Sequence, residues 1–183
     1  RIMNIKSLTI YCSSSNNLNS DYYKLAETIG IYLAKKSIKI IYGGGSVGMM
    51  GKVSKAAFKS NGNVVGIIPE FLINKEIVNT FTTKTIIVKN MLQRKKKLFN
   101  LGDGFLILPG GSGTIEEATE IISWKLLGLH NKEIIIFNYK NYWNELIKTY
   151  QKAKVEKFGN KNLQNICKHI KTIQEFKNLF HNV

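Results

Sequence analysis

Leu108-Pro109-Gly110-Gly111-Ser112-Gly113-Thr114-Ile115-Glu116-Glu117 is the stretch that decides the fold prediction. Residues 104–108 form a short apolar run, which is typical of a buried parallel strand. After the glycines, apolar residues recur at helical spacing, at Ile115, Ala118, Ile122 and Leu126. Three glycines therefore lie where a strand turns into a helix, and their missing side chains let the backbone approach a ligand. The free N–H groups at such a helix start suit a phosphate.

A purely structural interpretation of the same stretch stays open. Thr114-x-x-Glu117 has the form of a capping box, in which Glu117 would only accept a backbone N–H. The stretch is not a P-loop, because no Lys follows the glycines, and its glycine spacing differs from the usual dinucleotide fingerprint.

Strand and helix patterns alternate along the 183 residues. The patterns predict strands over residues 7–12, 38–42, 63–68, 85–88, 104–108 and 133–137. They predict helices over residues 22–35, 47–60, 91–101, 114–128, 141–152 and 172–179, the last one opened by a second capping box at Thr172 and Glu175. We expect one α/β domain over residues 1–183: a Rossmann-like, doubly wound parallel sheet flanked by helices, with residues 1–5 and 180–183 frayed.

Ligands of such sheets bind outside the carboxyl ends of the strands. Residues 43–51 form a second glycine-rich turn at that edge, although tight backbone packing is an alternative reason for its glycines. The polar loop 12–17 and the start of the helix at residue 91 fall at the same edge. From these segments we expect the pocket to be lined by Ser13, Gly44, Gly45 and Met91.

The chain carries a net charge of +15, which attracts polyanions and favours capture of anionic substrates. Nucleic-acid binding is therefore a rival interpretation. The basic residues are mostly Lys and scattered along the chain, so charge alone is weak evidence for it.

Cysteine and histidine usage gives no sign of a metal site. Cys12 and Cys167 have no framework spacing, which predicts free thiols and a reducing cytoplasm. Cys167-x-His169 is too little for zinc, and we expect neither metal nor cofactor. The chain contains no run of about 18 apolar residues, so we expect no membrane span.

Two motifs in order resemble the paired signature of the LONELY GUY family. They are Met91-Leu92-Gln93-Arg94-Lys95 and the stretch from Pro109 to Glu117. The resemblance extends from the first strand to about Leu146 and includes residues 42–51 and 122–128. Members are cytokinin riboside 5′-monophosphate phosphoribohydrolases, often labelled lysine decarboxylases; this chain offers no recognisable pyridoxal phosphate site.

The resemblance implies Arg94 and Glu117 as the catalytic residues. It implies a substrate-binding set made of Glu76, Lys95, Gly110, Gly111, Ser112, Gly113, Thr114, Ile115, Glu116 and Ser123. Ser123 stands where the family usually has Thr, so its hydroxyl is kept. Ser112 replaces an aromatic residue frequent in plant members, which leaves the specificity for base or prenyl group open.

The implied reaction is hydrolysis of the N-glycosidic bond of a nucleoside 5′-monophosphate, either AMP or a cytokinin riboside monophosphate. Its products are a free base and ribose 5-phosphate, which fits cytokinin biosynthesis or nucleotide turnover. Glycosidic cleavage passes through a cation-like sugar, which the Glu117 carboxylate could stabilise. The family also implies a homodimer with the site near the interface. The alternatives are a non-catalytic nucleotide-binding module of this fold and a basic nucleic-acid-binding protein.

Overall fold

The computed structural model describes residues 3–73, 80–159 and 163–180. There the strands form one seven-stranded sheet, parallel at every pairing, in the order β4-β3-β2-β1-β5-β6-β7. The strands are β1 (Ser7–Tyr11), β2 (Lys39–Tyr42), β3 (Val64–Pro69), β4 (Lys84–Val88), β5 (Gly104–Ile107), β6 (Glu133–Phe137) and β7 (Lys168–Ile170). The helices are α1 (Ser20–Lys35), α2 (Gly48–Lys59), α3 (Met91–Leu101), α4 (Ser112–Leu126), α5 (Asn144–Val155) and α6 (Ile173–Asn178).

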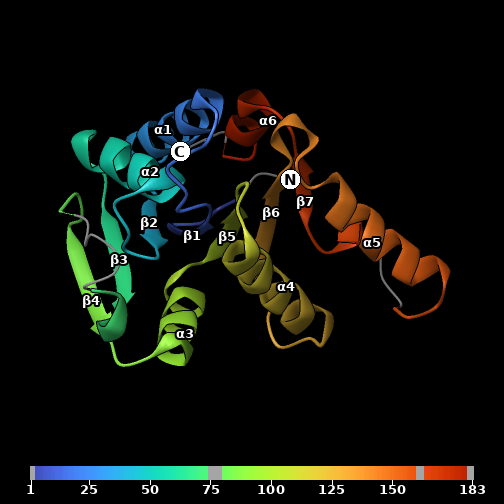
Figure 1. Ribbon diagram of the computed structural model, residues 1–183. Helices are drawn as coiled ribbons and strands as arrows, with labels where there is room; N and C mark the ends of the chain where they lie inside the picture. The colour runs from blue at the N-terminus through green and yellow to red at the C-terminus, as the bar shows by residue number, and fades with distance from the viewer. Residues whose placement is uncertain (1–2, 74–79, 160–162, 181–183) are drawn as a thin grey trace.

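The helices cover both faces of the sheet (Figure 1). Helices α1, α2 and α6 pack on one face, and α3, α4 and α5 lie on the other. Each face has its own apolar cluster, because strands β1, β3 and β5 are buried over their whole length and carry apolar residues toward both sides. The prediction of a doubly wound parallel α/β sheet is confirmed.

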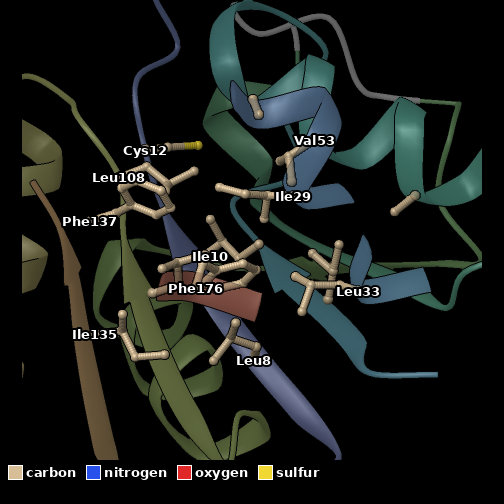
Figure 2. Close-up of a cluster of buried hydrophobic side chains, with 14 of the residues drawn as sticks. Leu8, Ile10, Cys12, Ile29, Leu33, Val53, Leu108, Ile135, Phe137 and Phe176 are labelled. Carbon is tan, nitrogen blue, oxygen red and sulfur yellow. The ribbon is translucent and has the colours of Figure 1, made fainter. Parts of the chain in front are cut away.

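Figure 2 shows the cluster beneath α1, α2 and α6. Phe176 of α6 lies against the sheet, and its ring centroid is 6.1 Å from that of Phe137. The labelled members are fully or almost fully buried: Leu8, Ile10, Cys12, Ile29, Leu33, Val53, Leu108, Ile135, Phe137 and Phe176. This packing holds β1 and β5, the two strands that lead into the site, in fixed register.

The segment before α5 differs from the sequence prediction. A helix was expected over residues 141–152, but a 3₁₀ turn (Tyr139–Asn141) comes first and α5 begins at Asn144. Lys140 and Asn141 have φ angles of 52° and 61°, which a right-handed helix does not contain. Tyr142 therefore belongs to a turn at the edge of the sheet rather than to the helix.

The C-terminal part also differs. Helix α5 continues to Val155, beyond the predicted end at residue 152, and a further 3₁₀ turn covers Leu163–Asn165. Strand β7 pairs with β6 and was not predicted, because three residues with one buried apolar side chain give too short a pattern.

The two predicted capping boxes have different outcomes. At α6 the box is confirmed, since Thr172 and Glu175 each accept the other's backbone N–H. At α4 it is wrong, because Gly111 is the N-cap and Thr114 lies within the helix.

Residues near both chain ends pack into the protein where fraying was expected. The N–H of Met3 donates to the carbonyl of Leu179 at 2.8 Å, and Met3 and Phe180 are both buried. The free energy gained by burying an apolar side chain exceeds the conformational entropy that a chain end would otherwise keep. Residues 1–2 and 181–183 lie outside the described part.

Candidate active site

A cavity of about 350 Å³ opens where the chain leaves the carboxyl ends of β1 and β5. The helix that follows β1 covers one face of the sheet and the helix that follows β5 covers the other, so the two loops diverge and leave a crevice. The cavity is lined by Cys12, Ser13, Ser14, Ser15, Met50, Met91, Arg94, Gly111, Ser112, Gly113, Thr114, Glu116 and Glu117.

The N-terminus of α4, which follows the glycine turn, faces this cavity. No described side chain caps the helix at Gly111. A Cβ added at Gly111 or Gly113 would meet no described atom within 4 Å, so packing does not require glycine there. A Cβ at Gly110 would instead collide with the buried Thr114 side chain. Gly111 and Gly113 thus leave backbone N–H groups accessible to an anion, whereas Gly110 leaves the room that Thr114 needs for the turn to close.

Arg94 is buried, with 6% of its surface exposed, although it lies in a run of basic residues. Its Nη2 donates to the carbonyl of Gly43 at 2.6 Å, and its Nη1 contacts the Met91 sulfur at 3.9 Å. Asn90 caps α3 by accepting the N–H of Gln93 at 2.9 Å, which fixes the turn that carries Arg94. A solvated basic face describes Lys96 and Lys97, which are exposed, but not Arg94.

Glu117 faces the same cavity from α4. Burial raises the pKa of its carboxyl from the ordinary 4.5 to about 7, and the Arg94 and Lys95 charges partly oppose that rise. Glu116 and Glu120 add to it. A carboxyl that titrates near neutral pH beside a buried guanidinium is suited to proton transfer and to stabilising a developing positive charge.

Lys95 links α3 to α4. Its ammonium lies 2.6 Å from Glu116 and 3.0 Å from Glu120, and these carboxylates raise the pKa of Lys95. The side chain was predicted to bind substrate; in the structure it pairs with two acids on the helix that carries Glu117.

Other predicted residues lie in different places. Ser13 and Met91 line the cavity, whereas Gly44 and Gly45 do not. Gly44 (φ +81°) packs against Ile67 and Ile68, which supports the packing interpretation of that turn. Three further predicted residues also lie away from the cavity lining: Gly110 lines a second cavity, and Ile115 and Ser123 are exposed on α4. Glu76 lies outside the described residues.

Sequence reasoning missed the second cavity, of about 250 Å³, which adjoins the first at the glycine turn. It shares Ser13, Ser15 and Gly111 with the first and is otherwise lined by Leu18, Tyr22, Met49, Pro109, Gly110 and Tyr142. The Tyr142 hydroxyl donates to the Gly110 carbonyl at 2.8 Å. No local pattern indicated this contact, because its partners are 32 residues apart.

Within the described ranges, no three His, Cys, Asp or Glu side chains gather as a metal site would require. Cys12 and Cys167 are free and buried, and burial raises the pKa of both thiols. The same ranges contain no helix with the length and apolar character needed to cross a bilayer.

Comparison with known proteins also relates this chain to the family that the two motifs resemble. A family profile described as "Possible lysine decarboxylase" matches residues 50–179. A cytokinin riboside 5′-monophosphate phosphoribohydrolase of Rhodococcoides fascians is 40% identical over 84% of this chain and 78% of its own. Arabidopsis thaliana LOG1, which bears the same enzyme name, is 37% identical over 84% of this chain and 72% of its own length. The molybdenum cofactor binding protein of Rippkaea orientalis shares the fold, with a TM-score of 0.71 and 18% identity. The match covers 97% of this chain and 96% of that one.

Proposed function

Because this chain belongs to the LONELY GUY family, we propose that it hydrolyses the N-glycosidic bond of a nucleoside 5′-monophosphate, releasing the base and ribose 5-phosphate. One observation carries the proposal: Arg94 and Glu117 line the same cavity as the uncapped N-terminus of α4. A phosphate, a sugar and an acid–base group can meet there.

The 5′-phosphate would be held by the backbone N–H groups of residues 111–114 and by the Thr114 hydroxyl, with the helix dipole favouring its charge. The ribose would then face Glu117, about one helical turn further along α4. The Ser112 hydroxyl lines the same cavity and offers a further contact to the nucleotide.

In the reaction, the bond between C1′ and the base nitrogen breaks and leaves a cation-like sugar. The Glu117 carboxylate stabilises that charge and accepts a proton from the attacking water, whose oxygen bonds to C1′. The departing base takes up one proton, which balances the proton that the attacking water gives to Glu117. Arg94, held by Gly43, supplies fixed positive charge beside Glu117 and keeps its carboxylate populated near neutral pH.

Lysine decarboxylation is not proposed, despite the description of the matched profile. A pyridoxal phosphate enzyme needs a lysine to form the Schiff base. The described lining of the cavity contains no lysine, and Lys95 is held by Glu116 and Glu120.

The test is incubation with AMP and with isopentenyladenosine monophosphate, with ribose 5-phosphate and free base measured by mass spectrometry. We expect release from at least one of them and loss of release in Glu117→Gln and Arg94→Met. Nucleotide binding without any turnover would instead support the non-catalytic module, and absence of turnover across a panel of purine and pyrimidine monophosphates would overturn the proposal.

We also propose a cytoplasmic homodimer. Helices α3 and α4 lie on one face of the molecule and expose Leu92 and Leu127, each to 74%, together with Met91, Ile115 and Leu126. A second copy would cover these apolar side chains. The free buried thiols support a reducing compartment.

A further inference from the structure

Three successive carbonyl groups of the glycine turn each accept a hydrogen bond. The Pro109 carbonyl accepts the N–H of Ser13 at 3.1 Å, and the Gly111 carbonyl accepts the N–H of Ile115 at 3.0 Å. Between them, the Gly110 carbonyl accepts the hydroxyl of Tyr142 at 2.8 Å. Two of these bonds come from the backbone, and the middle one depends on a single side chain.

The middle bond sets the direction of a donor on the opposite side. The Gly110 carbonyl and the Gly111 N–H belong to one planar peptide unit, and the described chain has no cis peptide bond. In a trans unit the two groups point in opposite directions. Tyr142 lines only the second cavity, whereas Gly111 also lines the cavity of Arg94 and Glu117. With the carbonyl held toward Tyr142, the opposite N–H of Gly111 points away from Tyr142 and is left available to a ligand in that cavity.

The Tyr142 ring is held in place. Its centroid lies 4.9 Å from that of Trp143, which is buried, and 6.5 Å from that of Tyr22, both in edge-on contacts. The glycine turn, in contrast, has no side chain of its own at residues 110 and 111 to restrain the peptide. The hydroxyl is therefore the one described hydrogen-bond donor that acts on this peptide directly, between two carbonyls that the backbone already holds.

We infer that Tyr142 is a positioning residue for phosphate binding, acting through the Gly110–Gly111 peptide. The inference rests on the proposed function, because it assigns the phosphate to this turn. A contact that only binds phosphate stabilises the ground state and the transition state alike, so its loss raises KM and leaves kcat unchanged.

The test compares Tyr142→Phe with the unaltered protein by calorimetry, using AMP and inorganic orthophosphate as probes. Loss of one hydrogen bond predicts that the variant binds both about fivefold to tenfold more weakly. In steady-state assays KM rises by a similar factor, while kcat and the pH midpoint of activity stay within error. Tyr139→Phe is the matched control: Tyr139 lies in the preceding 3₁₀ turn, and the described contacts include no hydrogen bond from it to the glycine turn.

Equal affinity for AMP in Tyr142→Phe and the unaltered protein would overturn the inference. So would a fall in kcat with no change in KM, which would indicate a general disturbance of the site. If the unaltered protein binds AMP but releases no ribose 5-phosphate, the proposed hydrolysis fails while the binding comparison still decides the role of Tyr142. If the unaltered protein binds neither probe, the inference fails as well.

Discussion

The Nη2 atom of Arg94 lies 2.6 Å from the carbonyl oxygen of Gly43, and the space that a Cβ of Gly43 would take is filled by the same guanidinium. The glycine at the end of β2 is thus required by Arg94. A side chain at this position of the turn would take the space that the Arg94 guanidinium now occupies.

Gly43→Ala tests that relationship. The added methyl collides with the tip of the Arg94 side chain, which can move aside without unfolding the protein. Displacing a positioned charge by about 1 Å can cost up to about a hundredfold in rate, so we expect kcat/KM to fall at least about tenfold with Tm nearly unchanged. Gly159→Ala is the control, since its Cβ would meet no described atom within 4 Å. Full activity in Gly43→Ala would show that the position of Arg94 does not matter.

Glu117→Gln should abolish turnover and yet stabilise the protein above neutral pH. The pKa of Glu117 is raised from 4.5 to about 7 on folding, so ionising it in the folded protein costs free energy. The folded state binds more protons between these values, and its stability falls as pH rises from about 4.5 to about 7. Removing the charge should therefore raise the free energy of unfolding by on the order of 2 kcal/mol at pH 8 and change it little at pH 4.

Urea unfolding of both proteins at pH 4 and pH 8 measures this difference. A variant that is less stable than the unaltered protein at pH 8 would show that Glu117 is not held at an energetic cost.

Lys95→Met should move the pH dependence of activity. If the Glu117 carboxylate is the active form, kcat/KM rises with pH through about 7. The Lys95 charge lowers the pKa of Glu117, whereas Glu116 and Glu120 raise it. Removing Lys95 deletes a cation and leaves two acids without their ion pair, so the midpoint of the profile should move upward. Lys96→Met, on the exposed side of α3, should leave the midpoint in place; an unchanged midpoint in Lys95→Met contradicts the electrostatic role.

Leu127→Asp should separate the proposed homodimer. A charge in the middle of an apolar contact is costly to bury, so the variant should be monomeric at micromolar concentrations where the unaltered protein is dimeric. Phe158→Asp, at a residue that is even more exposed than Leu127 but lies beyond the end of α5, should stay dimeric. Light scattering measures the oligomeric state of each protein. An unaltered protein that is monomeric at these concentrations would contradict the proposed homodimer.

The sequence indicated those parts of the site that depend on local pattern. The strand before the glycines and the helix after them both follow from apolar periodicity, and the predicted β/α alternation placed Arg94 and Glu117 at one sheet edge. Burial of Arg94 in a basic run could not be seen, because it depends on Gly43, which is 51 residues away. The Tyr142 contact was hidden in the same way, and two residues with positive φ removed Tyr142 from its expected helix.

A crystal structure of Glu117→Gln soaked with AMP tests the central claim most directly. We expect the phosphoryl oxygens within hydrogen-bond distance of the N–H groups of residues 111–114, with the ribose turned toward residue 117. AMP bound with its phosphoryl group away from this turn, for example at the cavity lined by Lys52 and Lys55 beside α2, would contradict the account.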